Sequence, residues 1–395
     1  MQKINGPLSD TNDRLAWIDA ARGFAILGIF MVNVPAFNAP FFLYGGEKEY
    51  FSSSIDYMTQ SFIDIFFQAS FYTLFSFLFG FGIQMLIDRL STRTAKINTF
   101  IFRRLFVLLC FGLIHAFLLW HGDILLSYGL IGMFLFLFFK RTNRTLTLWA
   151  FSLLLIPAGL YTYLLYQFRD QLDVVDNQAI SQAFANYGQG TYIEVLQQNY
   201  QDWANTNTVF GYFFLICTLL PLFLLGMVFA RKRWLHDVEV NKTVLKRLWI
   251  ITLVLFIVGK AGPYLVGNPT WLSFPQDIIG GTASAIFYII SLTLLYQKRN
   301  LQRYLVPFTY VGRMSLSNYI LQSVISFWLF YSVGLGLYGK VSPFGSVIIV
   351  LVIYCFQILA SKWWMKRYKF GPLEWLWRVL MYGQNFAIKR MVKRG

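Results

Sequence analysis

Apolar runs long enough to cross a lipid bilayer recur along the whole chain, and they restrict its fold more than any other feature. A membrane-spanning helix needs about 20 mostly apolar residues, because the hydrocarbon core is about 30 Å thick. We predict about ten spanning helices, over residues 15–37, 61–87, 105–120, 124–139, 146–167, 209–230, 248–266, 278–296, 306–335 and 345–365. The sequence therefore predicts an all-α, polytopic integral membrane protein.

Composition excludes a water-soluble globular domain. Apolar residues make up 57% of the 395 residues and charged residues only 13%, whereas soluble domains carry about 25% charged residues. Short connections between the apolar runs predict one transmembrane domain over 15–365, preceded by a polar segment, 1–14, and followed by a basic tail, 366–395. Apolar residues at helical spacing after Pro372 predict an interfacial helix in this tail.

The loops alternate in charge along the chain, which indicates an orientation in the membrane. The 34 Lys and Arg residues outnumber the 18 Asp and Glu residues, and most of them lie in every second loop and in the tail. Since cytoplasmic loops are enriched in Lys and Arg, we expect both termini in the cytoplasm. The acidic connection 169–207, with short interfacial helices near 179–187 and 192–200, is expected outside. Basic residues spread over short loops predict the bilayer as a partner and no nucleic acid.

Three polar residues, Asp19, Arg22 and Asn33, interrupt the first apolar helix. At about 100° per residue, Asp19 and Arg22 lie one turn apart, and Asn33 returns to nearly the same face about 16 Å further along the axis. A charged side chain facing lipid costs at least about 2.5 kcal/mol near the bilayer centre, so we expect this face to contact a protein interior or a wet cavity. The structural alternatives are a neutralising Asp19–Arg22 pair and an interhelical hydrogen bond from Asn33.

A second group of polar residues surrounds the third apolar helix. Arg104 precedes it on the cytoplasmic side, His115 lies beyond mid-membrane, and His121 and Asp123 lie at the outer surface. Histidine has an ordinary pKa close to neutrality, which suits it to act as a general base. His115 also fits a hydrogen-bonded core residue, Asp123 an N-cap of the next helix, and Arg104 the positive-inside rule.

The segment GRMSLSNYILQS, 312–323, places further polar groups within the ninth apolar helix. Arg313 lies near mid-depth, and Ser317, Asn318 and Gln322 lie above it on neighbouring azimuths. Because an intramembrane arginine also stands in the first helix, we expect a polar cavity between these two helices.

Five segments together resemble one known family. They read WIDAARGFAILGIFMVN, FSFLFGFG, RRLFVLLCFGLIHAFLLWHGDILLSYG, VGRMSLSNYILQS and FGPLEWLWR. In these segments the chain is similar to the YeiB-like bacterial membrane proteins, a family related to heparan-alpha-glucosaminide N-acetyltransferase and to the O-acyltransferases that modify bacterial surface sugars. The resemblance implies a bacterial cell-membrane protein that transfers an acyl group from cytoplasmic acyl-CoA, acetyl-CoA above all, to an acceptor on the outer face.

The chain departs from these acyltransferases at their histidine. The O-acyltransferases have histidine where this chain has Asn33, and the N-acetyltransferase has one in the loop after the first helix, where residues 38–60 contain none. The base is then His115 or His121, and His115 is the one that lies in a segment matching the YeiB-like proteins. We expect Asp123 to orient His115 and Asn33 to donate to the developing oxyanion. The expected donor-binding residues are Asp19, Arg22, Arg104 and Arg313, and the expected acceptor-binding residues are Ser317, Asn318, Gln322 and His121.

Two other functions stay open at this point. A transporter or export permease is the main alternative, because intramembrane charges and glycine-interrupted segments, such as the one at Gly280 and Gly281, suit alternating access. A non-catalytic scaffold or sensor, in which the polar residues only fix helix packing, is the other. The three cysteines, Cys110, Cys217 and Cys355, all lie in apolar runs and predict neither a disulfide framework nor a metal site. The acceptor and a homodimer are left open.

Overall fold

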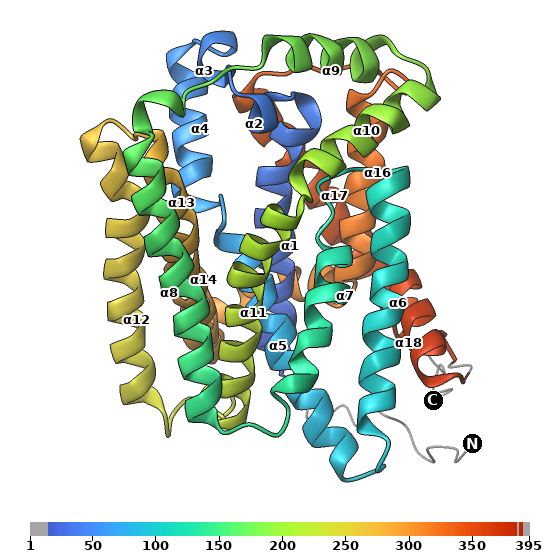
Figure 1. Ribbon diagram of the computed structural model, residues 1–395. Coiled ribbons are helices and arrows are strands. Elements are labelled where there is room, and N and C mark those ends of the chain that lie inside the picture. Colours follow the sequence, from blue (N-terminus) through green and yellow to red (C-terminus); the bar gives the residue numbers. More distant parts are fainter. Residues whose placement is uncertain (1–14, 385–386, 390–395) are drawn as a thin grey trace.

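The computed structural model describes residues 15–384 and 387–389. Within these residues the chain is helical, and the only β contact is an isolated bridge between Tyr368 and Lys389. Figure 1 shows long helices side by side, with short helices gathered at one end, which we call the cap end. The short helices there are α2 (Phe41–Tyr44), α3 (Glu47–Tyr50), α9 (Asn177–Gln189) and α10 (Tyr192–Thr206).

Eight helical segments in the described part of the chain are long and apolar enough to cross a membrane. They are α1 (Ala16–Asn38), Ser54–Ser91 with α4 (Ser54–Phe66) and α5 (Ser70–Ser91), α6 (Ile97–Leu118), α8 (Asn143–Gln167), α11 (Val209–Arg231), Lys242–Val266 beginning with α12 (Lys242–Phe256), Thr270–Gln297 ending with α14 (Gly281–Gln297), and α17 (Pro343–Arg367). The predicted all-α polytopic fold is confirmed, and these segments contain every predicted helix except two.

The two remaining predicted helices are shorter or broken. The helix predicted over 124–139 consists of α7 (Leu125–Met133) and a 3-10 turn, Phe134–Leu137. The helix predicted over 306–335 is divided after Gly312 into α15 (Arg299–Gly312) and α16 (Ser315–Phe330). The prediction of one continuous helix there is therefore wrong, and the count of about ten becomes eight long spans, one short apolar helix and one broken pair.

The break between α15 and α16 follows from contacts that the apolar pattern does not reveal. Met314 leaves the helical conformation, with φ −122° and ψ 35°. The Asn318 side chain donates hydrogen bonds to the carbonyls of Val311 (3.3 Å) and Met314 (3.0 Å), on either side of the break. Gly312 packs against the backbone of Asp19 in α1, where a Cβ would overlap the carbonyl oxygen. A broken helix is tolerated inside a membrane because such contacts satisfy its backbone.

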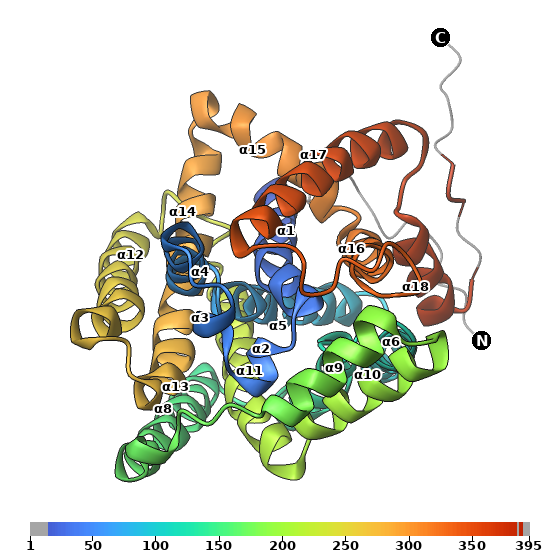
Figure 2. The same ribbon diagram turned by 90° about the horizontal axis from the view of Figure 1, so that it is seen from above.

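Glycines bring the central helices into close contact. A Cβ on Gly80 of α5 would overlap the carbonyl of Phe223 in α11, and a Cβ on Gly226 of α11 would overlap the carbonyl of Phe77 in α5. Figure 2 shows α1 and α5 near the centre of the helical array, with α12, α8 and α17 toward its periphery. The small residues of the FSFLFGFG segment thus hold α5 against its neighbour.

The hydrophilic connection 169–207 lies across the cap end (Figures 1 and 2). The two short helices predicted there are confirmed as α9 and α10. Within the basic tail, the predicted helix is confirmed as α18 (Pro372–Tyr382), whose Tyr382 ring contacts Phe100 in the first turn of α6. We call this opposite end of the bundle the tail end.

Candidate active site

His115 lies near the cap end of α6 with only 1% of its surface exposed. Its Nδ1 atom is 2.8 Å from Oδ1 of Asp123, and its Nε2 atom is 2.7 Å from Oγ of Ser323 in α16. The structure thus places His115 beside Asp123, as the sequence predicted, and adds Ser323 from a helix 208 positions away in the sequence. We call these three residues the His115 cluster.

The tight turn between α6 and α7 explains why His115 meets Asp123. Oδ2 of Asp123 accepts a hydrogen bond from the backbone N–H of Leu126 (2.6 Å), which caps the start of α7. A Cβ on Gly112 would overlap the backbone of Leu126, so glycine lets α6 and α7 approach this closely. The second carboxylate oxygen of Asp123 is thereby turned toward the imidazole. Asp123 therefore both caps α7 and contacts His115.

The two contacts of the imidazole define what it can do chemically. A carboxylate beside Nδ1 favours a proton on that nitrogen, which leaves Nε2 of the neutral ring as an acceptor. The Ser323 hydroxyl then donates to Nε2. An imidazole held between a carboxylate and a hydroxyl is the arrangement by which proteins remove a proton from a reacting O–H or N–H group.

Ser323 is the site residue that sequence reasoning missed. It ends the GRMSLSNYILQS segment, and it lies one turn after Tyr319, whose ring centroid is 5.0 Å from that of His115. The available signal was the run of polar residues on an otherwise apolar helix, which continues with the buried Ser326. Sequence spacing alone does not say which of these hydroxyl groups faces another helix.

Asn33 is half-buried on α1, and within the described residues its amide forms no hydrogen bond. One turn later, Phe37 stacks on Trp120 with ring centroids 4.2 Å apart, so this part of α1 lies beside the turn that follows α6. The proposed role of Asn33 at an oxyanion stays a prediction.

His121 belongs to the cap rather than to the His115 cluster. Its Nδ1 atom lies 3.8 Å from Oδ2 of Asp202 in α10. The same carboxylate accepts hydrogen bonds from Tyr44 (2.6 Å) and Tyr187 (2.8 Å). Burial lowers the pKa of His121, against the opposing charge of Asp202, so the ring is neutral at pH 7.

The cap also forms a hydrogen bond with α6 next to the His115 cluster. The Asn199 side chain in α10 donates a 2.7 Å hydrogen bond to the carbonyl of Ala116, the residue after His115. An acceptor molecule that reaches His115 from the cap end must therefore pass or displace α10.

The polar residues predicted to bind the acceptor lie mainly in contacts between helices. Asn318 donates to Ser361 (3.0 Å) and Gln322 donates to Gln357 (2.8 Å), and both partners are in α17. Ser317 donates to the Glu374 carboxylate of α18 at 2.6 Å. These contacts bind α16 to α17 and α18, and they supply no exposed binding surface by themselves.

Glu374 fills the amino end of α16. Its carboxylate accepts hydrogen bonds from the backbone N–H groups of Leu316 (2.7 Å) and Ser317 (3.1 Å). Burial raises the pKa of Glu374, while these hydrogen bonds act in the opposite direction. A helix amino end attracts anions, and here a residue of the tail occupies that position.

Three of the four residues predicted to bind the donor lie toward the tail end. Arg22 of α1 has Nη1 3.7 Å from Oδ1 of the buried Asp19, and its guanidinium lies beside Gly82 of α5. Arg104 of α6 stacks on Trp377 of α18, 4.4 Å from the ring centroid. Arg22 and Arg104 both lie toward the tail end of their helices. Arginines suit the binding of a phosphorylated ligand. Arg313, the fourth residue, stands at the break between α15 and α16.

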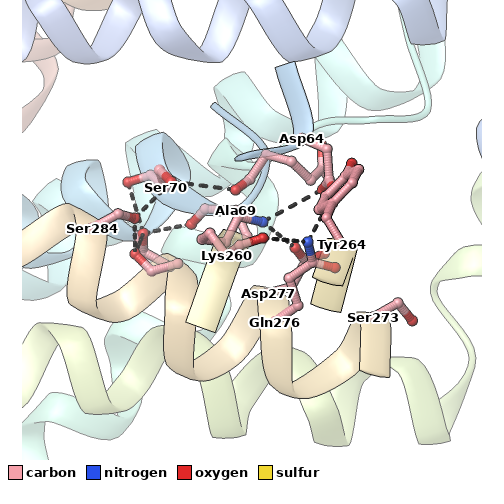
Figure 3. A network of polar contacts seen from close by, with 12 residues as sticks. Asp64, Ala69, Ser70, Lys260, Tyr264, Ser273, Gln276, Asp277 and Ser284 are labelled. Carbon is pink, nitrogen blue, oxygen red and sulfur yellow. Dashed lines mark hydrogen bonds and ion pairs between the residues drawn. The ribbon is translucent and has the colours of Figure 1, made fainter. Parts of the chain in front are cut away.

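A second polar cluster, around Lys260, was not predicted from the sequence. Figure 3 shows Lys260 between Asp277 and Asp64, with Tyr264 and Gln276 bound to Asp64. Its members come from three separate spans, and each charge stands alone within an apolar run. The sequence does show single charged residues in three predicted helices or at their ends. It does not show which of these charged residues contact one another.

Fold and sites together define a multi-pass helical membrane protein with two buried polar clusters. A family model described as "Protein of unknown function (DUF418)" matches residues 229–384. YxaH of Bacillus subtilis (strain 168) is 36% identical over 388 residues, which cover 94% of this chain and 95% of that relative. YeiB of Escherichia coli (strain K12) is 28% identical over 397 residues, covering 93% and 96%.

The chain belongs to the YeiB-like family that these relatives represent. Both relatives are described as uncharacterized proteins, as is a 39.9 kDa protein of Bacillus acidopullulyticus with 28% identity over 383 residues, 95% of this chain and 96% of that relative. No solved structure matches the chain. A link to the acyltransferases therefore rests on the chemistry of the site.

Proposed function

We propose that the protein transfers an acyl group from acyl-CoA, with acetyl-CoA as the first candidate donor, to an acceptor that approaches from the cap end. The observation that carries this proposal is the buried imidazole of His115 between Asp123 and Ser323. A histidine held in this way removes a proton from an attacking hydroxyl or amine.

Every bond and proton of the transfer reaction can be accounted for with the donor, the acceptor and His115. Nε2 of His115 takes the proton of the acceptor O–H or N–H group while the acceptor atom forms a bond to the thioester carbonyl carbon. The C–S bond then breaks, and the CoA thiolate leaves and takes up the proton. Asp123 stabilises the imidazolium that forms in between. The Ser323 hydroxyl, whose Oγ lies 2.7 Å from Nε2, marks the position that an acceptor hydroxyl would take.

The donor is proposed to enter from the tail end. The guanidinium groups of Arg22 and Arg104 supply positive charge for the phosphates of CoA, and Arg313 adds a third cation on another helix. The proposed orientation places this end in the cytoplasm of a bacterial cell. A dimer is compatible with the proposal, but the chemistry needs one copy of the chain.

The test is CoA release from acetyl-CoA by the purified protein in nanodiscs, with a cell-envelope extract as the source of acceptors. His115→Ala is expected to lower the rate at least about 100-fold, since general base catalysis contributes about 10² to 10⁴. His236→Gln is the matched control, because His236 lies after α11 and stacks on Phe81, away from the cluster. Wild-type protein that releases no CoA, or His115→Ala protein that equals wild type, contradicts the proposal.

Interruptions in the spans favour transport as the second candidate. The helical path is broken between α15 and α16, and the span Lys242–Val266 contains a π-helical turn, Ile257–Ala261. Discontinuous helices line the substrate sites of many transporters. Proteoliposomes that accumulate a solute from an envelope extract without any acyl donor would support this candidate, and acyl-CoA-dependent modification without accumulation would exclude it.

A further inference from the structure

A cavity of about 310 Å³ lies at the cap end, apart from the residues of the His115 cluster. Its walls come from the last turns of α1, from α2 to α4, and from the ends of the spans that carry Tyr264 and Asp277. Apolar and aromatic side chains form one part of the wall, and polar side chains form another. The volume suits a small organic molecule.

Three members of the Lys260 cluster, Asp64, Tyr264 and Asp277, form part of the polar wall. Nζ of Lys260 lies 2.9 Å from Oδ1 of Asp277 and 3.5 Å from Oδ1 of Asp64, and the lysine side chain is fully buried (Figure 3). Oδ2 of Asp64 accepts hydrogen bonds from Tyr264 (2.7 Å) and Gln276 (2.9 Å). These contacts hold both carboxylates in fixed positions at the edge of the cavity.

Two π-helical turns create this arrangement. Lys260 lies in the π-helical turn Ile257–Ala261, and Asp277 lies in a second one, Gln276–Gly280. The two turns touch, since a Cβ on Gly259 would be 2.8 Å from the Cα of Gly280. π-helical turns are rare in proteins and occur frequently at functional sites. Their pairing beside a cavity indicates a binding site rather than a packing contact alone.

The charges around the cavity do not cancel. Glu47, Asp64 and Asp277 face it with three carboxylates, whereas Lys48 and Lys260 supply two ammonium groups, which leaves one negative charge when all five are ionised. The two aspartates keep 26% and 31% of their side-chain surface exposed, so they can contact a ligand.

Three buried polar atoms of the cavity wall lack hydrogen-bond partners within the described residues, namely Oγ of Ser346, Oδ1 of Asn38 and Nε2 of Gln60. Ser346 is 1% exposed and its Oγ forms no hydrogen bond within the described residues. The Nδ2 of Asn38 donates to the carbonyl of Val341 (2.6 Å), but its Oδ1 accepts none among those residues. Buried polar atoms are rarely left unsatisfied, so atoms of this kind beside a cavity indicate a ligand or water. Both oxygens can accept a hydrogen bond from an N–H donor.

We propose that this cavity binds an organic cation whose ammonium group pairs with Asp64 and Asp277. The ammonium N–H groups donate to the carboxylates and neutralise the excess negative charge. The apolar body of the ligand packs against Phe41, Phe42 and Phe51, whose ring faces also attract positive charge. The site is independent of acyl transfer, so the proposal of cation binding and the proposal of acyl transfer can be tested separately.

The test compares two probe molecules that differ in charge but hardly in shape. Phenethylamine and the uncharged phenethyl alcohol are titrated into the purified full chain in nanodiscs, and heat or tryptophan fluorescence reports binding. We expect phenethylamine to bind at least tenfold more tightly than the alcohol. Asp277→Asn is expected to weaken phenethylamine binding at least tenfold, and Glu49→Gln, an exposed acid of α3 outside the cavity wall, is expected to leave it unchanged.

Because the two probes are compared on the wild-type protein, the proposal can be tested even if the variants do not fold. Equal affinity of the two probes, or no binding of the amine, overturns the proposal without any substitution. If Asp277→Asn fails to give a monodisperse protein, Asp64→Asn replaces it, because Asp64 is the other carboxylate beside Lys260. Unchanged amine binding in a folded variant of either aspartate also overturns the proposal.

Discussion

At the scale of single residues, the candidate active site could be predicted in part. His115 was expected to be oriented by Asp123, and the two side chains lie 2.8 Å apart, although their spacing in the sequence could not show that they touch. Ser323 and the Lys260 cluster could not be predicted, because their contacts join spans far apart in the sequence. A periodic apolar pattern gives the face of a helix, but it does not give the neighbour that this face meets.

One substitution of Asp123 can separate its proposed role in catalysis from its role in capping α7. Asparagine caps a helix about as well as aspartate, so Asp123→Asn should keep the hydrogen bond to Leu126 and the melting temperature. It removes the charge beside His115, and CoA release is expected to fall at least about 100-fold, within the range of general base catalysis.

The matched control for this substitution is Asp176→Asn. Asp176 caps α9 by accepting a hydrogen bond from Ala179 (2.9 Å) and lies in the cap, outside the His115 cluster. Rate measurements and thermal unfolding of both variants are compared with wild type. Equal rates in Asp123→Asn and Asp176→Asn would show that the charge of Asp123 has no part in the reaction.

At the scale of helices, the sequence predicted nearly every span but not the interruptions. Long apolar runs suffice to identify spans, because lipid forces the backbone to form helices. The breaks after Phe66 and after Gly312 lie inside such runs, and they depend on contacts with other helices. The hydrogen bonds of Asn318 to Val311 and Met314 show this most directly, since an asparagine in an apolar run predicts no particular partner.

The contact between α5 and α11 can be tested with a matched pair of glycine substitutions. A Cβ on Gly226 would overlap the backbone of Phe77, which cannot rotate away, so Gly226→Ala should force the helices apart. Overpacking of this kind costs about 1 to 3 kcal/mol. Gly159 in α8 has no atom within 4 Å of its Cβ position, and Gly159→Ala should be neutral or slightly stabilising.

Both glycine variants are measured by unfolding in detergent, with helicity followed by circular dichroism. A loss of stability confined to Gly226→Ala supports the close contact of the two helices. Equal stability of the two variants would mean that α5 and α11 are not packed through their backbones.

At the scale of the whole molecule, basic residues gather at the tail end. Loops at this end contain Arg93, Lys140, Arg141, Lys232 and Lys298, and Arg231 contacts one of them by donating to the carbonyls of Phe139 (2.9 Å) and Arg141 (2.7 Å). The cap end instead carries the acidic α9–α10 segment. This asymmetry supports the proposal that the tail end faces the cytoplasm.

The orientation can be tested by labelling cysteines in intact cells. Asp170 lies before α9 with 88% of its side chain exposed, and Glu239 lies between α11 and α12 with 75% exposed. After Cys355, the exposed natural cysteine, is replaced by serine, Asp170→Cys should react with a membrane-impermeant maleimide. Glu239→Cys should react only after the cells are permeabilised, and the reverse result would invert the proposed topology.

The hydrogen bonds of the cap also determine when it can assemble during synthesis. Asp202 binds Tyr44 across 158 positions of the sequence, while the backbone N–H of Ser332 donates to Tyr187 and that of Gly339 donates to Asn38. The segment that contains Ser332 and Gly339 follows α16 and is among the last to leave the ribosome. The cap end is therefore completed only after almost all of the helices have been synthesised, so a chain cut off before residue 330 would lack the contacts of Ser332 and Gly339 that hold the cap together.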